Sequence, residues 1–170
     1  MVLKYVFAIH LKLAYTLNIG ADYHLEGIEM SFSVAEMTIN DYDQVWALWK
    51  SSPAIVLTKV DSRESIQKFL ARNTGLSYVA MDGDECVGAV LCSHDGRMGY
   101  LSNLVVREDR RREGIGRQLV GRCMYALTGL GIHKCMLLIM KETSEAQNFW
   151  KSVDSGGRVS LVMMGLREKG

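Results

Sequence analysis

Three short strand-like runs that follow one another with almost no connecting chain constrain the fold of this sequence most. The runs cover residues 76–81, 86–92 and 98–106, and Asp-Gly turn signals at residues 82–84 and 94–96 separate them. Parallel strands need a crossover of a dozen or more residues, so connections this short require antiparallel pairing. We therefore expect an antiparallel meander in the middle of the chain.

The pattern changes after the third run. Residues 114–127 have the apolar spacing of a helix, and residues 134–140 form a nearly continuous apolar run typical of a buried strand. Residues 144–153 indicate another helix and residues 159–164 a last strand. The meander is thus expected to feed a β-α-β unit, and a final hairpin is expected to close the chain.

The segment before the meander predicts one strand and two helices. Residues 32–37 alternate between apolar and polar side chains, as a half-buried strand does. Asn40 or Asp41 is expected to cap a first helix, and Asp61 or Ser62 a second.

The length of 170 residues favours one compact domain. Residues 2–19 are fairly apolar, but Lys4, His10 and Lys12 interrupt the run, which fits neither a membrane span nor a signal peptide well. A plausible first strand begins just after Met30. We therefore expect residues 1–29 to be an N-terminal extension of uncertain structure, and residues 30–170 to form the folded domain.

Charge and cysteine usage exclude some classes of partner. The formal net charge of +1 argues against charge-driven binding to nucleic acid or acidic membranes. The cysteines form no CxxC pair and have no histidines at zinc spacing, so no metal site is expected. Reduced, buried thiols in a reducing compartment, the cytoplasm, are the expectation for all four. They are Cys86, Cys92, Cys123 and Cys135.

The chemistry is concentrated where the third strand gives way to a helix. A basic turn with Arg111 and Arg112 leads into Gly114 and Gly116, and Arg117 follows in the predicted helix. A helix N-terminus presents unpaired N–H groups and the positive end of the dipole, and glycines let a phosphate approach that backbone. The alternative is a solvated basic turn before an ordinary helix. The order of strand, arginines, glycines and helix favours an anion site, most simply for a pyrophosphate.

This segment resembles the acetyl-CoA-binding motif of the GNAT superfamily of N-acetyltransferases, whose core reads Arg/Gln-x-x-Gly-x-Gly/Ala. Arg111, Gly114 and Gly116 fill its defined positions. The resemblance spans roughly residues 31–164 and looks closest to small bacterial members, which approach the motif through His-Asp-Gly-Arg-x-Gly-Tyr, here residues 94–100. It implies an α/β (α+β) fold with a mixed, mostly antiparallel central sheet of about six to seven strands flanked by about four helices.

The resemblance also implies a binding site for acetyl-CoA, used as a co-substrate without a metal. In the family, the backbone of the strand before the motif binds the pantetheine arm, and the turn and helix start bind the pyrophosphate. The residues that match are Leu104, Val105 and Val106 on the strand, and Arg111, Arg112, Glu113, Gly114, Ile115, Gly116 and Arg117 on the turn and helix.

A second family pattern, Asn-x-x-Ala-x-x-Phe-Tyr, is only partly present. Ala146 and Phe149 match it, while Thr143 replaces the Asn that commonly contacts the cofactor. Asn148 is a second candidate for that contact. Trp150 replaces the Tyr that often protonates the leaving thiolate, and an indole has no accessible ionisation at neutral pH.

Acetyl transfer to an amine needs an oxyanion donor and a route for protons. The resemblance places the donor N–H on the fourth strand of the family's sheet, within residues 101–105. The candidates for a base are His94, Asp95 and Tyr100, which would act directly or through water held by Ser102 or Asn103. His94 and Asp95 also suit an ordinary turn.

The resemblance favours an enzyme that transfers acetyl from acetyl-CoA to a primary amine of a small molecule or peptide. The departures at Thr143, Trp150 and residues 154–158, where related chains carry an aromatic after glycine, keep open a module that binds acyl-CoA without useful catalysis. A nucleotide-binding domain is a weaker alternative, because neither GxxxxGK[ST] nor GxGxxG occurs. A homodimer formed through the apolar residues 161–164 is expected from the family's habit.

Overall fold

The computed structural model describes residues 31–140, 148–149 and 159–164. The described strands form one sheet in sequence order, β1-β2-β3-β4-β5-β6. They are β1 (Ser33–Glu36), β2 (Tyr78–Asp82), β3 (Glu85–His94), β4 (Gly99–Val106), β5 (Cys135–Met140) and β6 (Val159–Met164). The helices are α2 (Tyr42–Ser51), α3 (Arg63–Arg72) and α4 (Ile115–Gly129), with short 3-10 turns η1 (Ile39–Asp41), η2 (Lys59–Asp61) and η3 (Glu108–Arg110).

The pairing of the strands confirms the meander and the β-α-β unit. Strands β1 to β4 pair antiparallel with their neighbours, and β5 pairs parallel with β4 after the crossover through α4. The expected final hairpin is wrong, because β6 lies parallel to β5, from Cys135↔Val159 to Met140↔Met164. The connection between these two strands, residues 141–158, is long enough for the crossover that parallel strands need.

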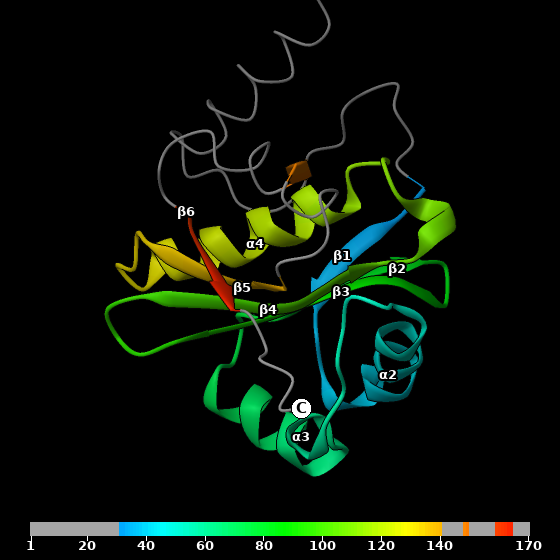
Figure 1. Ribbon diagram of the computed structural model, residues 1–170, viewed down its shortest axis with the longest axis horizontal. Coiled ribbons are helices and arrows are strands. Elements are labelled where there is room, and N and C mark those ends of the chain that lie inside the picture. Colours follow the sequence, from blue (N-terminus) through cyan, green and yellow to red (C-terminus); the bar gives the residue numbers. More distant parts are fainter. Residues whose placement is uncertain (1–30, 141–147, 150–158, 165–170) are drawn as a thin grey trace, which may run out of the picture. The chain divides into compact units, whose positions relative to one another are not determined.

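Helices cover both faces of the sheet. Figure 1 shows α4 over one face and α2 and α3 over the other. Leu119 and Leu127 of α4 belong to one apolar core, and Trp49 of α2 and Ile66 of α3 belong to the second. Strand β3 lies between the two cores, so a continuous run of its side chains is buried. This layering matches the α/β fold that the sequence resemblance implies.

The two N-terminal helices begin at different kinds of cap. Asp41, one of the two predicted residues, is the N-cap of α2, although its side chain makes no capping hydrogen bond there. Thr38 caps the preceding turn η1, which runs on into α2. The Asp41 carboxylate instead accepts from the Thr38 N–H at 2.7 Å, which completes a capping box. Ser62 caps α3, as predicted, and its hydroxyl accepts from the Ser65 N–H at 3.4 Å.

Several sequence expectations concern segments outside the described residues. These include the extension at residues 1–29, the cofactor candidate Thr143, Trp150 and residues 154–158. Asn148 and Phe149 are described and are helical. Within the described part of the chain, no helix is long and apolar enough to cross a membrane.

Candidate functional site

Strands β4 and β5 separate partway along their length. They pair only from Gly99↔Cys135 to Leu101↔Leu137, although β4 continues to Val106 and β5 to Met140. Beyond Leu101 the edge of β4 that faces β5 no longer has β5 as a ladder partner. Backbone N–H and C=O groups without a ladder partner are available to a ligand that can lie along the strand. We call this feature the β4–β5 opening.

A bulge in β4 lies where the opening begins. Ala89 pairs with Val105 and Leu91 with Ser102, so Val90 alone opposes both Asn103 and Leu104. Asn103 has φ +50°, a left-handed conformation that asparagine tolerates better than most residues. A bulge increases the local twist of its strand, which accounts for the divergence of β4 from β5 at this point.

Helix α4 follows the C-terminal end of β4, and the β3–β4 turn is at the other end of that strand. Gly114 is its N-cap at φ +89°, without a side-chain cap, and the Gln118 N–H donates to the Gly114 C=O at 3.0 Å. The N–H groups of residues 115–117 precede that first helical bond and carry the positive end of the dipole. A Cβ at Gly114 would meet nothing within 4 Å, so this helix start has room for an anion. The structure therefore fits the anion site predicted from the sequence.

Gly116 has a different environment from Gly114. It is buried, and a Cβ there would lie 3.1 Å from Cζ and 3.3 Å from Cε2 of Phe149. That Gly116 also lets a phosphate approach the helix backbone stays a prediction. The absent Cβ makes room for the Phe149 ring, and only the backbone N–H of Gly116 can serve an anion.

Two arginines of the basic turn have structural partners that the sequence did not indicate. Arg107 pairs with Glu85 at 2.9 Å and with Asp109 at 2.7 Å. The side chain of Arg110 is only 11% exposed; it pairs with Asp82 and with Glu113. These pairs tie the turn to the β2–β3 hairpin, and Arg110 also balances the charge of Glu113 beside the helix start.

The arginines that the sequence predicts for the anion site are exposed. Arg111, Arg112 and Arg117 are all exposed, and the Arg111 Nε donates to the Val106 C=O at 3.5 Å. Arg112 has φ +73°, which turns the chain sharply just before Gly114. The structure thus brings the turn residues 111–117 together at one helix start, beside the end of β4 that carries Leu104, Val105 and Val106.

Asp95 has the contacts of a turn residue. Its Oδ1 accepts from the N–H groups of Arg97 at 2.8 Å and Met98 at 2.7 Å, and its Oδ2 accepts from the Tyr100 hydroxyl at 2.7 Å. These hydrogen bonds, the one from Met98 most, lower the pKa of Asp95 to about 2, and they raise the pKa of Tyr100. A carboxylate so hard to protonate is a weak general base.

The turn that holds Asp95 is also remote from the start of α4. It precedes Gly99, the first residue of β4, while the basic turn follows Val106, the last. Seven residues of strand separate those ends, which is roughly 23 Å. Ser102 and Asn103, half-buried beside the bulge, lie between the two ends. Of the predicted catalytic residues, the structure therefore places Ser102 and Asn103, but not Asp95, at the β4–β5 opening.

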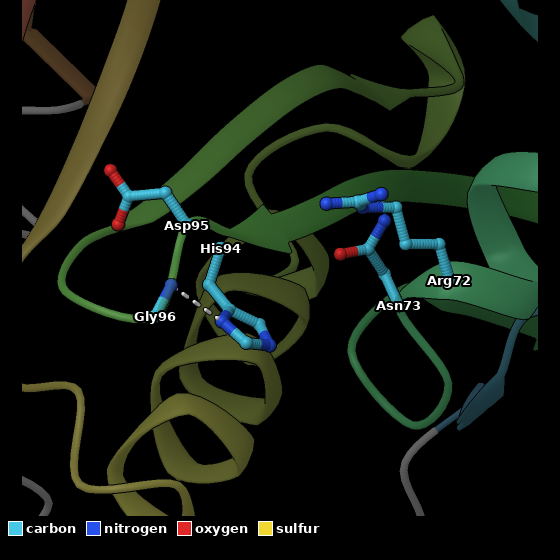
Figure 2. A pocket seen from close by; sticks show the side chains of 5 residues that line it. All are labelled: Arg72, Asn73, His94, Asp95 and Gly96. Carbon is cyan, nitrogen blue, oxygen red and sulfur yellow. Dashed lines mark hydrogen bonds between the residues drawn. The ribbon is translucent and has the colours of Figure 1, made fainter.

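A shallow hollow beside this turn is separate from the opening. It has a volume of about 320 Å³, and its lining residues are Arg72, Asn73, His94, Asp95 and Gly96. Figure 2 shows Asp95 directed away from His94, whose Nδ1 accepts from the Gly96 N–H at 3.0 Å. The Asn73 amide donates to the Phe69 C=O at 2.9 Å. In this hollow, His94 therefore hydrogen-bonds within the turn, and Asn73 hydrogen-bonds to the end of α3.

The cysteines have the environment that the sequence predicts. All four are buried and unpaired. Burial raises the pKa of Cys86 to about 11 and that of Cys135 to about 12, so these thiols stay protonated and unreactive at neutral pH. The described residues contain no group of three or more His, Cys, Asp or Glu side chains that could hold a metal ion.

Comparison with known families decides how this geometry is classified. The model of the acetyltransferase (GNAT) family matches residues 42–154, which is more than half of the chain. The chain belongs to the acetyltransferase (GNAT) family. Its GNAT motif therefore lies at a described strand–turn–helix junction, and the resemblance noted in the sequence is confirmed at the level of the family.

Curated relatives match over a limited segment. N-alpha-acetyltransferase 30 from Xenopus laevis is 44% identical over 57 residues, which is 31% of this GNAT chain and 21% of the relative. The Homo sapiens protein of the same name has the same identity over 57 residues, 16% of its length. The chain thus covers about a fifth of these relatives or less. These matches do not support the expectation of a small bacterial protein.

Solved structures share the GNAT fold at low sequence identity. Ard1 from Thermoplasma volcanium has a TM-score of 0.66 at 17% identity, and the match covers 74% of this chain and 82% of that one. The NatC complex bound to Gag peptide and CoA has a TM-score of 0.61 at 21% identity, covering 72% and 83%. At such identities the likeness shows the fold, and it confirms the α/β architecture.

Proposed function

We propose that this chain transfers the acetyl group of acetyl-CoA to the α-amine of a peptide N-terminus. The observation that carries the acetyl-CoA part of the proposal is that the β4–β5 opening leads along β4 toward the start of α4, which has no side-chain cap. A long ligand with an anionic end and an amide-bearing arm fits that arrangement, because the helix start suits the anion and the strand edge suits the amides.

The proposed cofactor contacts are mainly with the backbone. Backbone N–H groups of residues 112–117 bind the pyrophosphate, and the exposed side chains of Arg112 and Arg117 supplement their charge. Backbone groups of residues 104–106 pair with the pantetheine amides. Asn148, which is exposed on the helical turn with Phe149, is the described candidate for the additional contact at which the family commonly uses asparagine.

The proposed reaction is direct transfer. The neutral amine attacks the thioester carbonyl, the C–N bond forms, and a backbone N–H within residues 101–105 donates to the oxyanion. The C–S bond then breaks, the nitrogen loses one proton and the thiolate of CoA gains one. Water held at Ser102 carries that proton in our proposal, because the side-chain amide of Asn103 donates to Asp61. Asp95 takes no part in our proposal, because its hydrogen bonds make its carboxylate a weak base.

The acceptor class rests on the relatives. The segment that is 44% identical to N-alpha-acetyltransferase 30 favours a peptide α-amine over a lysine, polyamine or drug. The NatC complex bound to Gag peptide and CoA has the same fold. The alternative function, a module that binds acyl-CoA without catalysis, was suggested by residues outside the described ones. No described residue favours that alternative.

A thiol-release assay across matched acceptors tests the proposed function. The panel contains one peptide with a free α-amine and no lysine, the same peptide with a blocked N-terminus and one internal lysine, a polyamine and a free amino acid. We expect release of CoA thiol with the first peptide at a rate at least tenfold above the others. Equal rates across the panel would contradict the acceptor class, and no release with any acceptor would contradict the activity.

Location and assembly are part of the proposal. We place the protein in the cytoplasm, because its buried, unpaired thiols suit a reducing compartment. We also propose a homodimer, because β6 is at the edge of the described sheet and an edge strand can pair with a second copy. Light scattering at working concentration would measure twice the mass of the chain, and a monomer mass would contradict the dimer.

A further inference from the structure

The bulge residue Asn103 contacts two elements on the α2/α3 side of the sheet. Its backbone C=O accepts from the Trp49 Nε1–H at 3.1 Å, near the end of α2. Its side-chain amide donates to the Asp61 Oδ1, also at 3.1 Å, at the end of η2. One residue at the start of the β4–β5 opening is therefore joined to both ends of the segment that connects α2 with α3.

Asp61 is the other half of this connection. Only 9% of the residue is exposed, and a carboxylate that buried needs hydrogen-bond donors. Its Oδ2 accepts from the Thr58 N–H at 2.8 Å and from the Thr58 hydroxyl at 3.3 Å. Its backbone C=O accepts from the Tyr42 hydroxyl at 3.0 Å. The Oδ2 atom of Asp61 thus hydrogen-bonds within its own turn, to Thr58, and the Oδ1 atom hydrogen-bonds to Asn103 of β4.

The segment held in this way is the α2–α3 loop, residues 52–62. It carries large apolar side chains in solvent, with Val56 at 56% and Val60 at 73% exposure. Helix α4, whose start receives the anion in the proposed function, covers the opposite face of the sheet (Figure 1). An acceptor that approaches the β4–β5 opening from the α2/α3 face therefore passes the α2–α3 loop.

We propose that Asn103 is a positioning residue that fixes the α2–α3 loop at the β4–β5 opening through its hydrogen bond with Asp61. The inference rests on the proposed function and deepens it, because it assigns the acceptor side of the site. Asn103 suits this role in two ways. It tolerates the left-handed bulge conformation, and its amide supplies the donor that the buried carboxylate needs.

Substitutions at the two positions separate positioning from simple support of the bulge. Asn103→Gly keeps the left-handed backbone and removes the amide. Asn103→Asp keeps a residue that tolerates the conformation but places a second carboxylate against Asp61. In the double variant Asn103→Asp/Asp61→Asn, the amide introduced at position 61 donates to the carboxylate introduced at position 103. The oxygen of that amide still accepts from the Thr58 N–H, so the double variant restores the connection.

The kinetic expectation is a change on the acceptor side alone. Asn103→Gly and Asn103→Asp should each lower kcat/KM for the peptide at least tenfold, and the affinity for acetyl-CoA measured by calorimetry should stay within twofold. The double variant should recover kcat/KM to within about threefold of wild type. Lys68→Gln, an exposed change on α3 outside the loop, should leave both parameters unchanged. No recovery in the double variant, or an equal fall in acetyl-CoA affinity, would overturn the positioning role.

Hydrogen exchange tests the connection independently of turnover. Deuterium uptake in residues 52–62 should be faster in Asn103→Gly than in wild type, and uptake in α4 should be unchanged, because the loss frees only the loop. Uptake that is unchanged in residues 52–62 overturns the proposal whether or not the protein is an acetyltransferase. A wild type without turnover, combined with faster uptake in the variant, would sink the proposed function and leave the connection between Asn103 and Asp61 standing.

Discussion

Arg117 and Arg122 are both exposed arginines of α4, but only one of them lies in its first turn. We propose that the pyrophosphate binds at that first turn, so Arg117→Gln removes a charge beside the ligand and Arg122→Gln removes one at a distance. We expect Arg117→Gln to weaken acetyl-CoA binding three- to tenfold, about 1 kcal/mol, and Arg122→Gln less than twofold. Calorimetry at fixed ionic strength measures both. Equal losses would mean that the effect comes from net charge.

Asp95 offers a second test at this scale. Hydrogen bonds lower its folded-state pKa from 3.8 to about 2. The stability that this carboxylate contributes is therefore present above about pH 4 and is lost as the pH falls through 2. Asp95→Ala should flatten the melting-temperature curve between pH 4 and pH 2. It should also keep kcat/KM and its pH profile between pH 6 and 9, whereas a profile that loses its basic limb would restore Asp95 as the base.

At the scale of elements, the packing of α4 distinguishes the motif residue Gly116 from Gly129 at the other end of the helix. Gly116→Val places methyl groups against the Phe149 ring, and such overpacking costs about 1–3 kcal/mol. We expect a fall in melting temperature of several degrees, measured by differential scanning calorimetry. Gly129→Ala is the control in the same helix, because a Cβ there meets nothing within 4 Å, and it should keep or raise the melting temperature. A stable Gly116→Val that binds no acetyl-CoA would instead return Gly116 to the phosphate site.

The elements that the sequence predicted are those with local causes. The strands of the meander, the helix cap at Ser62 and the glycine start of α4 each follow from residues a few positions apart. The direction of β6 did not follow, because the choice between a hairpin and a crossover depends on long-range pairing with β5.

The candidate site also has one part that the local sequence predicts and another that depends on long-range contacts. The turn that we propose to bind the anion was visible as a local motif, with Arg111, Gly114 and Gly116 in their expected order. The bulge at Asn103 and its bond to Asp61 join residues 42 positions apart, and nothing in either local sequence indicates the contact. The role of Arg110 was missed for the same reason, since its partner Asp82 belongs to another strand.

At the scale of the whole molecule, we propose that residues 30–170 form the folded domain and that residues 1–29 are an extension. The family match begins at residue 42, which leaves the extension outside it. A chain beginning at Met30 should melt within a few degrees of the full chain and bind acetyl-CoA with the same affinity. A large fall in melting temperature would show that residues 1–29 pack against the domain.

The central claim is that this GNAT chain acetylates peptide N-termini. The most direct measurement uses a single peptide that carries both a free α-amine and an internal lysine. After incubation with the protein and acetyl-CoA, fragmentation mass spectrometry locates the added acetyl group. The account predicts that the acetyl group is on the N-terminal nitrogen, with the lysine unmodified. Acetylation of the lysine alone, or unmodified peptide despite bound acetyl-CoA, would contradict it.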